Sequence, residues 1–214
     1  METKEDIKED IVDEIIKLTS EHIKLVKKAK RAIETIRPCY RCGYCCQNKE
    51  ILVTIPEVVL ILNKLDYKVE DIFNIDQEKC TISIKTKEIE GKPYCRFLWK
   101  TEFKTRCTIY NIRPFQCLTY PIIFHPLFKK LEVYKGKFLS YYIFECQGKA
   151  IKTCILLVKK STFKKLAEER LKFLRKNYEI QRALIKDDIL EDVLMMVVKN
   201  IRALDMDLEL DLNL

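Results

Sequence analysis

The stretch "RPCYRCGYCCQNKE", residues 37–50, places Cys39, Cys42, Cys45 and Cys46 within eight residues. A C-x2-C pair suits a tetrahedral metal ion, because a tight turn brings its two sulfurs to the separation that two ligands need. The second x2 step adds a third sulfur, as in the runs that wrap iron–sulfur clusters. The stretch departs from the ferredoxin pattern after Cys45, since the next cysteine is adjacent and no proline follows it. Disulfide, zinc and iron–sulfur cluster are the three candidates, and each implies a different protein.

The adjacent pair Cys45-Cys46 separates some of these candidates. Neighbouring side chains usually point to different sides of the backbone, so these two thiols are poorly placed to bind one small ion together. Either one of them faces elsewhere or the site holds more than one metal. The pair therefore favours a polynuclear or two-centre arrangement.

Composition argues against a disulfide scaffold. Ten cysteines in 214 residues fall below the density of small bridged domains. The start "METKEDIKED" lacks an apolar segment, and no apolar run approaches the roughly 18 residues of a membrane span. We therefore expect a cytoplasmic protein with no membrane contact, where clustered cysteines bind metal. The net charge of +8 is moderate, and aromatic residues do not interleave with a basic stripe, so nucleic-acid binding is not indicated.

The chain divides into three predicted parts, which together indicate an α+β fold. Residues 1–35 form an amphipathic helix, because apolar residues recur at steps of three and four from Ile7 to Ile33. Residues 36–154 contain every cysteine and form a metal-binding domain with short strands. Residues 155–214 form a helical extension. The prediction is thus a cysteine-rich mixed core flanked by long N-terminal and C-terminal helices.

Local patterns predict several elements within this frame. "ILVTI" (51–55) and "CTISIK" (80–85) have the composition of strands, and "PEVVLILNKL" (56–65) begins as a helix with proline in its first turn. A hairpin is expected to turn at Gly136. A helix is expected to begin at a cap, Ser161 or Thr162, and another restarts after Asp187 and Asp188.

Further thiols lie downstream of the opening run. Cys95, Cys107, Cys117 and Cys146 raise the number of candidate ligands to eight, enough for two four-ligand centres. Cys80 and Cys154 sit in apolar contexts, "KCTISI" and "KTCILLV", and are predicted to be small buried residues.

Taken together, "CYRCGYCC", "CRFL" and "CTIYNIRPFQCLTYP" resemble the CxxCxxCC family, also called YkgJ-like, of zinc- or iron-chelating domains. The resemblance covers about residues 36–124 and implies metal binding, without a particular reaction. Many members are labelled iron–sulfur-cluster-containing proteins. The matching positions are Cys39, Cys42, Cys45, Cys46, Cys95, Cys107 and Cys117, with Tyr110, Arg113, Pro114 and Pro121 completing the pattern.

Other residues near the thiols have supporting roles in this interpretation. Arg113 is expected to pair with the negative charge of clustered thiolates or to anchor a turn, and Tyr110 to donate a hydrogen bond near the sulfurs. His125 is a possible extra ligand, although a hydrogen-bonded histidine in an apolar setting explains it as well. His22 lies on the helix stripe and is expected to be packed.

The sequence leaves three functions open. The first is an iron–sulfur protein with one or two centres, each a four-iron, four-sulfur (4Fe–4S) cluster, acting in electron transfer, sensing or redox-assisted modification. The second is a structural zinc module that presents its terminal helices to a protein partner. The third is a metal-dependent enzyme whose substrate lies in an arginine-rich cleft. Motifs of common catalytic sites are absent from the sequence, so whether the protein is an enzyme stays open.

Overall fold

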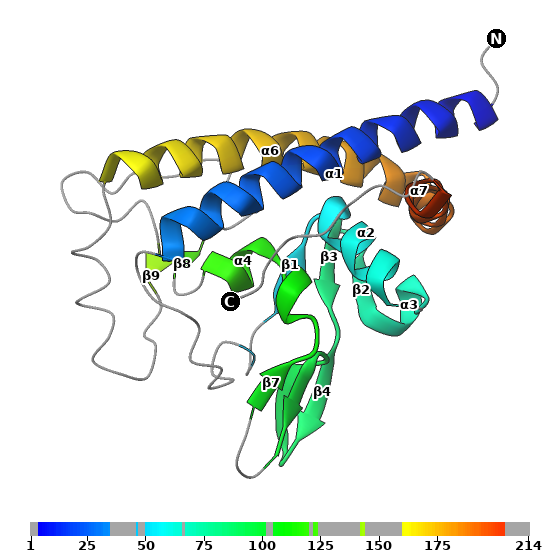
Figure 1. Ribbon diagram of the computed structural model, residues 1–214. Helices are drawn as coiled ribbons and strands as arrows, with labels where there is room; N and C mark the ends of the chain where they lie inside the picture. The colour runs from blue at the N-terminus through cyan, green and yellow to red at the C-terminus, as the bar shows by residue number, and fades with distance from the viewer. Residues whose placement is uncertain are drawn as a thin grey trace.

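The computed structural model describes residues 4–34, 46, 50–65, 67–101, 105–119, 122–123, 142–143 and 160–203. It confirms the predicted α+β class, with helices toward both ends and short antiparallel strands between them (Figure 1). Two long helices, α1 (Lys4–Glu34) and α6 (Lys160–Lys186), lie along one side of the molecule. The last helix, α7 (Leu190–Ala203), follows α6.

The predicted apolar stripe of α1 is buried in the chain's own core. Ile15, Leu18, Val26 and Ala29 are each at most 1% exposed, as steps of three and four on one helix face require. This face contacts α6, α7, α2 (Ile55–Lys64) and α4 (Phe115–Thr119). The N-terminal helix α1 therefore packs its apolar face on the core of its own chain.

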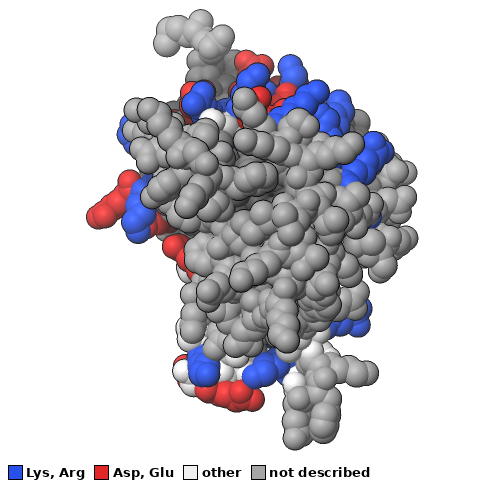
Figure 2. Space-filling model, turned by 90° about the vertical axis from the view of Figure 1, so that its left-hand side faces the viewer, with Lys and Arg blue, Asp and Glu red and all other residues white. Residues whose placement is uncertain are grey.

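Ion pairs between the long helices lie at the edges of these contacts. Lys28 pairs with Glu169 at 2.8 Å, and Lys176 pairs with Glu21 at 3.3 Å, both joining α6 to α1. Exposed pairs of this kind contribute little to stability, so apolar burial holds the helices together. Figure 2 shows described Lys and Arg side chains gathered along the upper part of one face, where Figure 1 places α1 and α6.

A three-stranded antiparallel sheet shares a hydrophobic cluster with α2. Its order is β1-β3-β2, with bounds Ile51–Val53, Thr81–Ile84 and Phe73–Asp76. All four residues of the central strand β3 are buried. The strand predicted over 51–55 ends at Val53, because Thr54 caps α2 and Ile55 is that helix's first residue. A short helix, α3 (Val69–Ile72), leads into β2.

Two hairpins extend from this sheet and carry two of the predicted ligands. The first pairs β4 (Thr86–Ile89) with β5 (Lys92–Cys95) through the turn Glu90-Gly91, both with positive φ. Positive φ at both turn positions matches the twist of the strands and favours glycine. The second hairpin pairs β6 (Leu98–Lys100) with β7 (Thr105–Cys107). A further short pair joins β8 (Ile122–Ile123) to β9 (Tyr142–Ile143).

The C-terminal helices agree with the prediction except at one end. α6 begins at Lys160, so neither Ser161 nor Thr162 is its N-cap, and that prediction was wrong. The helix begins earlier than the capping residues suggested. α7 restarts after Asp188 as expected, with Val193, Val197 and Ile201 each at most 1% exposed. None of the described helices is long and apolar enough to cross a membrane. The turn predicted at Gly136 lies outside the described residues.

Candidate metal centre

Cys95 and Cys107 lie on consecutive hairpins. Cys95 ends β5, and three residues later Leu98 begins β6 opposite Cys107. The backbone N–H of Thr108 donates to the carbonyl of Phe97 at 2.9 Å, and its hydroxyl donates to the same oxygen at 3.1 Å. These bonds hold the segment after Cys107 against the segment after Cys95.

Cys117 lies on α4, which the Arg113-Pro114 pair initiates. Arg113 is extended, as a residue before proline usually is, and ends the 3₁₀ turn η2 (Tyr110–Ile112). The carbonyl of Pro114 then accepts from the N–H groups of Cys117 and Leu118, both at 2.9 Å. The Arg113 guanidinium lies 4.1 Å from the centre of the Tyr110 ring. Arg113 therefore stacks on Tyr110 in the turn before Cys117, and the roles predicted for both residues near the thiols stay predictions.

α4 is oriented by packing on two sides. Phe115 and Leu118, three positions apart, are buried in a cluster with residues of α1 and α6. Cys117 instead packs against a different cluster, here called the main core cluster, which contains the β1-β3-β2 sheet, α2 and α7. The helix thereby places Cys117 against a different cluster from the one that buries Phe115 and Leu118.

Four candidate ligands reach this same main core cluster from separate segments. Cys95 is buried in it, and Cys46, Cys107 and Cys117 pack against it while remaining partly exposed. Cys80 is also buried there, as predicted, and its thiol contacts the carbonyl of Gln77 at 3.4 Å. Among the residues that the structure describes, however, no group of three Cys, His, Asp or Glu side chains is placed to hold a metal ion.

The remaining predicted ligands are outside the part of the chain that the structure describes. These are half of the eight predicted ligands. The possible extra ligand His125 and the predicted core residue Cys154 also lie outside the described residues. The ligand set as a whole therefore stays a prediction. The residues in question are Cys39, Cys42, Cys45 and Cys146.

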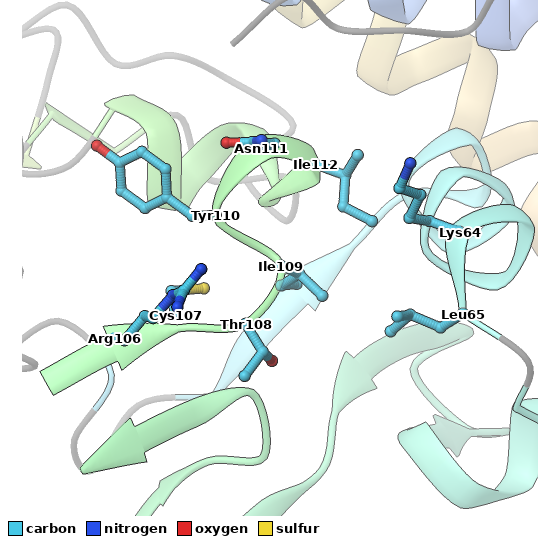
Figure 3. A pocket seen from close by; sticks show the side chains of 9 residues that line it. All are labelled: Lys64, Leu65, Arg106, Cys107, Thr108, Ile109, Tyr110, Asn111 and Ile112. Atoms are coloured by element: carbon cyan, nitrogen blue, oxygen red, sulfur yellow. The ribbon is translucent and has the colours of Figure 1, made fainter. Parts of the chain in front are cut away.

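A cavity of about 200 Å³ opens beside Cys107 (Figure 3). Leu65, Ile109 and Ile112 form an apolar part of its wall. Figure 3 shows Arg106 next to Cys107 on one side and Lys64, from the end of α2, on the other. Tyr110 and Asn111 complete the rim with Thr108. Cys107 is thus one of the residues that line the cavity, which has a basic side chain on either side.

A buried charged cluster that the sequence did not reveal contacts the start of α4. Glu57 is 2% exposed, Arg170 4% and His22 1%, and they come from α2, α6 and α1. The Arg170 guanidinium lies 3.5 Å from both the Glu57 carboxylate and the His22 ring, and 4.4 Å from the centre of the Phe115 ring. The pattern T-x-x-E, Thr54 to Glu57, was the one available signal, because a glutamate three residues after a cap often folds back on it.

The protonation states in this cluster follow from burial and from Arg170. Burial alone raises the pKa of Glu57, but Arg170, His22 and two backbone N–H groups together outweigh it and hold that pKa below its usual value. Burial lowers the pKa of His22 to about 4. His22 is therefore neutral at pH 7, and its contact with Glu57 at 3.8 Å is not an ion pair. Arg170 can only donate, so His22 Nδ1 accepts and Nε2 carries the proton toward Glu57.

Comparison with known families identifies the chain. Residues 38–177 match the model of the CxxCxxCC family, described as "Putative zinc- or iron-chelating domain". The match covers more than half of the chain, and this protein belongs to that family. No curated protein and no solved structure matches it.

The donor atoms of the described cysteines suit the metals that the family description names. Thiolates are soft ligands that suit zinc and iron, and three of the four described candidates are partly exposed at the edge of a core. Metal binding is thus supported by family membership and by the chemistry of the donors.

Proposed function

We propose that this protein carries an iron–sulfur centre held by the clustered cysteines and acts in electron transfer, sensing or redox-assisted modification. The proposal is supported by the contact of Cys46, Cys95, Cys107 and Cys117, from four separate segments, with one core cluster. One tetrahedral zinc ion needs only four ligands, whereas this chain supplies more candidates than that. The proposed ligands are Cys39, Cys42, Cys45, Cys46, Cys95, Cys107, Cys117 and Cys146.

When bound, an iron–sulfur centre supplies one-electron redox chemistry. This chain's own residues would set its environment: Cys95 lies in the apolar core, while Arg106 and Arg113 lie close to Cys107 and Cys117 in sequence. Positive charge near thiolates favours their deprotonated form and thereby metal loading. The proposal includes a reducing, cytoplasmic location, where these thiols stay available for metal.

The test is the metal and acid-labile sulfide content of protein purified without oxygen, together with its visible spectrum. We expect iron and sulfide in similar amounts and an absorption band that dithionite bleaches. Protein that contains neither iron nor sulfide would contradict the iron–sulfur proposal.

A structural zinc centre is the second candidate, because the family description names zinc beside iron. In this case the metal would fix the loop-rich segments around the two hairpins, and the exposed faces of the terminal helices would be offered to a protein partner. Zinc is redox-silent and colourless. Stoichiometric zinc without a visible band would favour this candidate over the first.

An enzymatic role has one specific observation in its favour, the cavity beside Cys107. Its size admits a small molecule, and Lys64 and Arg106 would attract an anionic one. Such a role predicts a metal position open to exogenous ligands. Cyanide added to the metal-loaded protein would then change its visible spectrum, and an unchanged spectrum would argue against an open site.

A further inference from the structure

We infer that Glu57 is a positioning residue for the metal centre, because its buried carboxylate holds the first residue of α4 and through it Cys117. The inference rests on the proposed metal-binding function, and nothing in the family description assigns a role to this glutamate. Glu57 itself lies on α2 and touches no candidate ligand in the described contacts. Its effect on the metal would therefore pass through α4.

The two carboxylate oxygens bind two different segments. Oε2 accepts from the backbone N–H of Thr54 at 2.7 Å, at the start of α2. Oε1 accepts from the backbone N–H of Phe115 at 2.8 Å, at the start of α4 and two residues before Cys117. The first N–H groups of any helix lack partners inside the helix, so a buried one needs an acceptor from elsewhere. Glu57 is that acceptor for α4.

α4 depends on such support because it has only five residues. A helix this short does not form enough internal hydrogen bonds to hold its own geometry. The charged cluster contacts Phe115 in two ways: Glu57 accepts a hydrogen bond from its N–H, and Arg170 stacks on its ring at 4.4 Å. Phe115 itself is 0% exposed. The direction in which α4 presents Cys117 is thus set by buried side chains from α2 and α6.

The chain also offers a matched control at the same place. Asn177 is buried like Glu57, and its side-chain oxygen accepts from the backbone N–H of Ile55 at 2.9 Å. Both residues therefore cap the start of α2. The side-chain amide of Asn177 also donates to Gln181, which in turn donates to the carbonyl of Cys80. Glu57 instead accepts from the first residue of α4. Loss of either should weaken the fold, but only loss of Glu57 should release Cys117.

The experiment compares Glu57→Gln with Asn177→Ala in the full-length protein. The N–H groups of Thr54 and Phe115 bind different carboxylate oxygens, and glutamine turns one of these oxygens into an NH2 donor, so it cannot keep both contacts. Three quantities are measured for each variant: the urea midpoint, the hydrogen exchange of the Phe115 amide, and the rate of metal loss to excess EDTA. For Glu57→Gln we expect exchange and metal loss to accelerate by about 10-fold or more. For Asn177→Ala we expect a lower urea midpoint with both rates close to wild type.

Two outcomes would overturn the inference. One is a protected Phe115 amide with unchanged metal loss in Glu57→Gln. The other is equal acceleration of metal loss in both variants, which would mean that metal loss only follows global stability. If Glu57→Gln does not fold, Glu57→Asp replaces it, because aspartate keeps the charge for Arg170 but is too short to reach both N–H groups. Wild-type protein that binds no metal would refute the proposed function instead, while the exchange of Phe115 would still test the contact.

Discussion

The Glu57 carboxylate and the Arg170 guanidinium lie 3.5 Å apart in the interior, between residues that are 113 positions apart in sequence. They join α2 to α6, and both contact Phe115, the first residue of α4. Buried charges are costly to desolvate, and they remain only where partners and hydrogen bonds compensate. Here the compensation comes from Arg170 and the N–H groups of Thr54 and Phe115.

Replacement of Arg170 should therefore destabilise the fold strongly. Arg170→Met leaves the Glu57 carboxylate buried without its cation, and we expect a loss of about 3–5 kcal/mol in the free energy of unfolding. Urea unfolding of the metal-loaded protein measures this. Combining Arg170→Met with Glu57→Gln should cost less than the sum of the two single variants, because the second change removes the unpaired charge. Strictly additive losses would show that the pair is not coupled.

His22 predicts a specific dependence of stability on pH. Its pKa falls to about 4 in the native state through burial, so the unfolded state binds more protons at intermediate pH. The free energy of unfolding should drop by up to about 3 kcal/mol as the pH falls from about 6.5 to 4. Above that window His22 contributes no pH dependence, because it is neutral in both states.

His22→Gln isolates this contribution, since glutamine keeps an acceptor for Arg170 and does not titrate. The difference in stability between wild type and His22→Gln should change across this window, while losses common to both proteins, such as acid release of metal, cancel. The lowered pKa of Glu57 adds its own loss only at the acidic end, as the pH falls through that pKa. A constant difference from neutral to acidic pH would contradict the assignment of a neutral buried His22.

The turn of the first hairpin offers a prediction away from the metal. Gly91 has φ +70, and no atom lies within 4 Å of the Cβ that an alanine would add. Gly91→Ala should therefore cost only backbone strain, about 1–2 kcal/mol in the free energy of unfolding. Metal content should be unchanged, as measured by metal analysis beside thermal unfolding. An unchanged stability would mean that this turn is not fixed in the native state.

Regular elements were predictable from the sequence, and long-range contacts were not. The apolar faces of α1 and α7 were predictable because Leu18 and Val197 belong to apolar patterns that repeat over several helical turns. Residues 96–121 have no clear period because β6 and β7 are three residues each, too short to repeat a pattern. Glu57 was missed because nothing local in the sequence indicates Arg170 as its partner. Cys80 was correctly predicted to be buried from its strand-like context.

The most direct test of the central claim compares two buried cysteines of the main core cluster. Cys95 and Cys80 are 5% and 3% exposed, so Cys95→Ala and Cys80→Ala create similar cavities in the same core. Both variants are purified without oxygen, and the molar ratio of metal to folded protein is measured. We predict that Cys95→Ala loses most of its metal while Cys80→Ala keeps the wild-type ratio. Equal metal content in the two variants would contradict a metal centre built on Cys95.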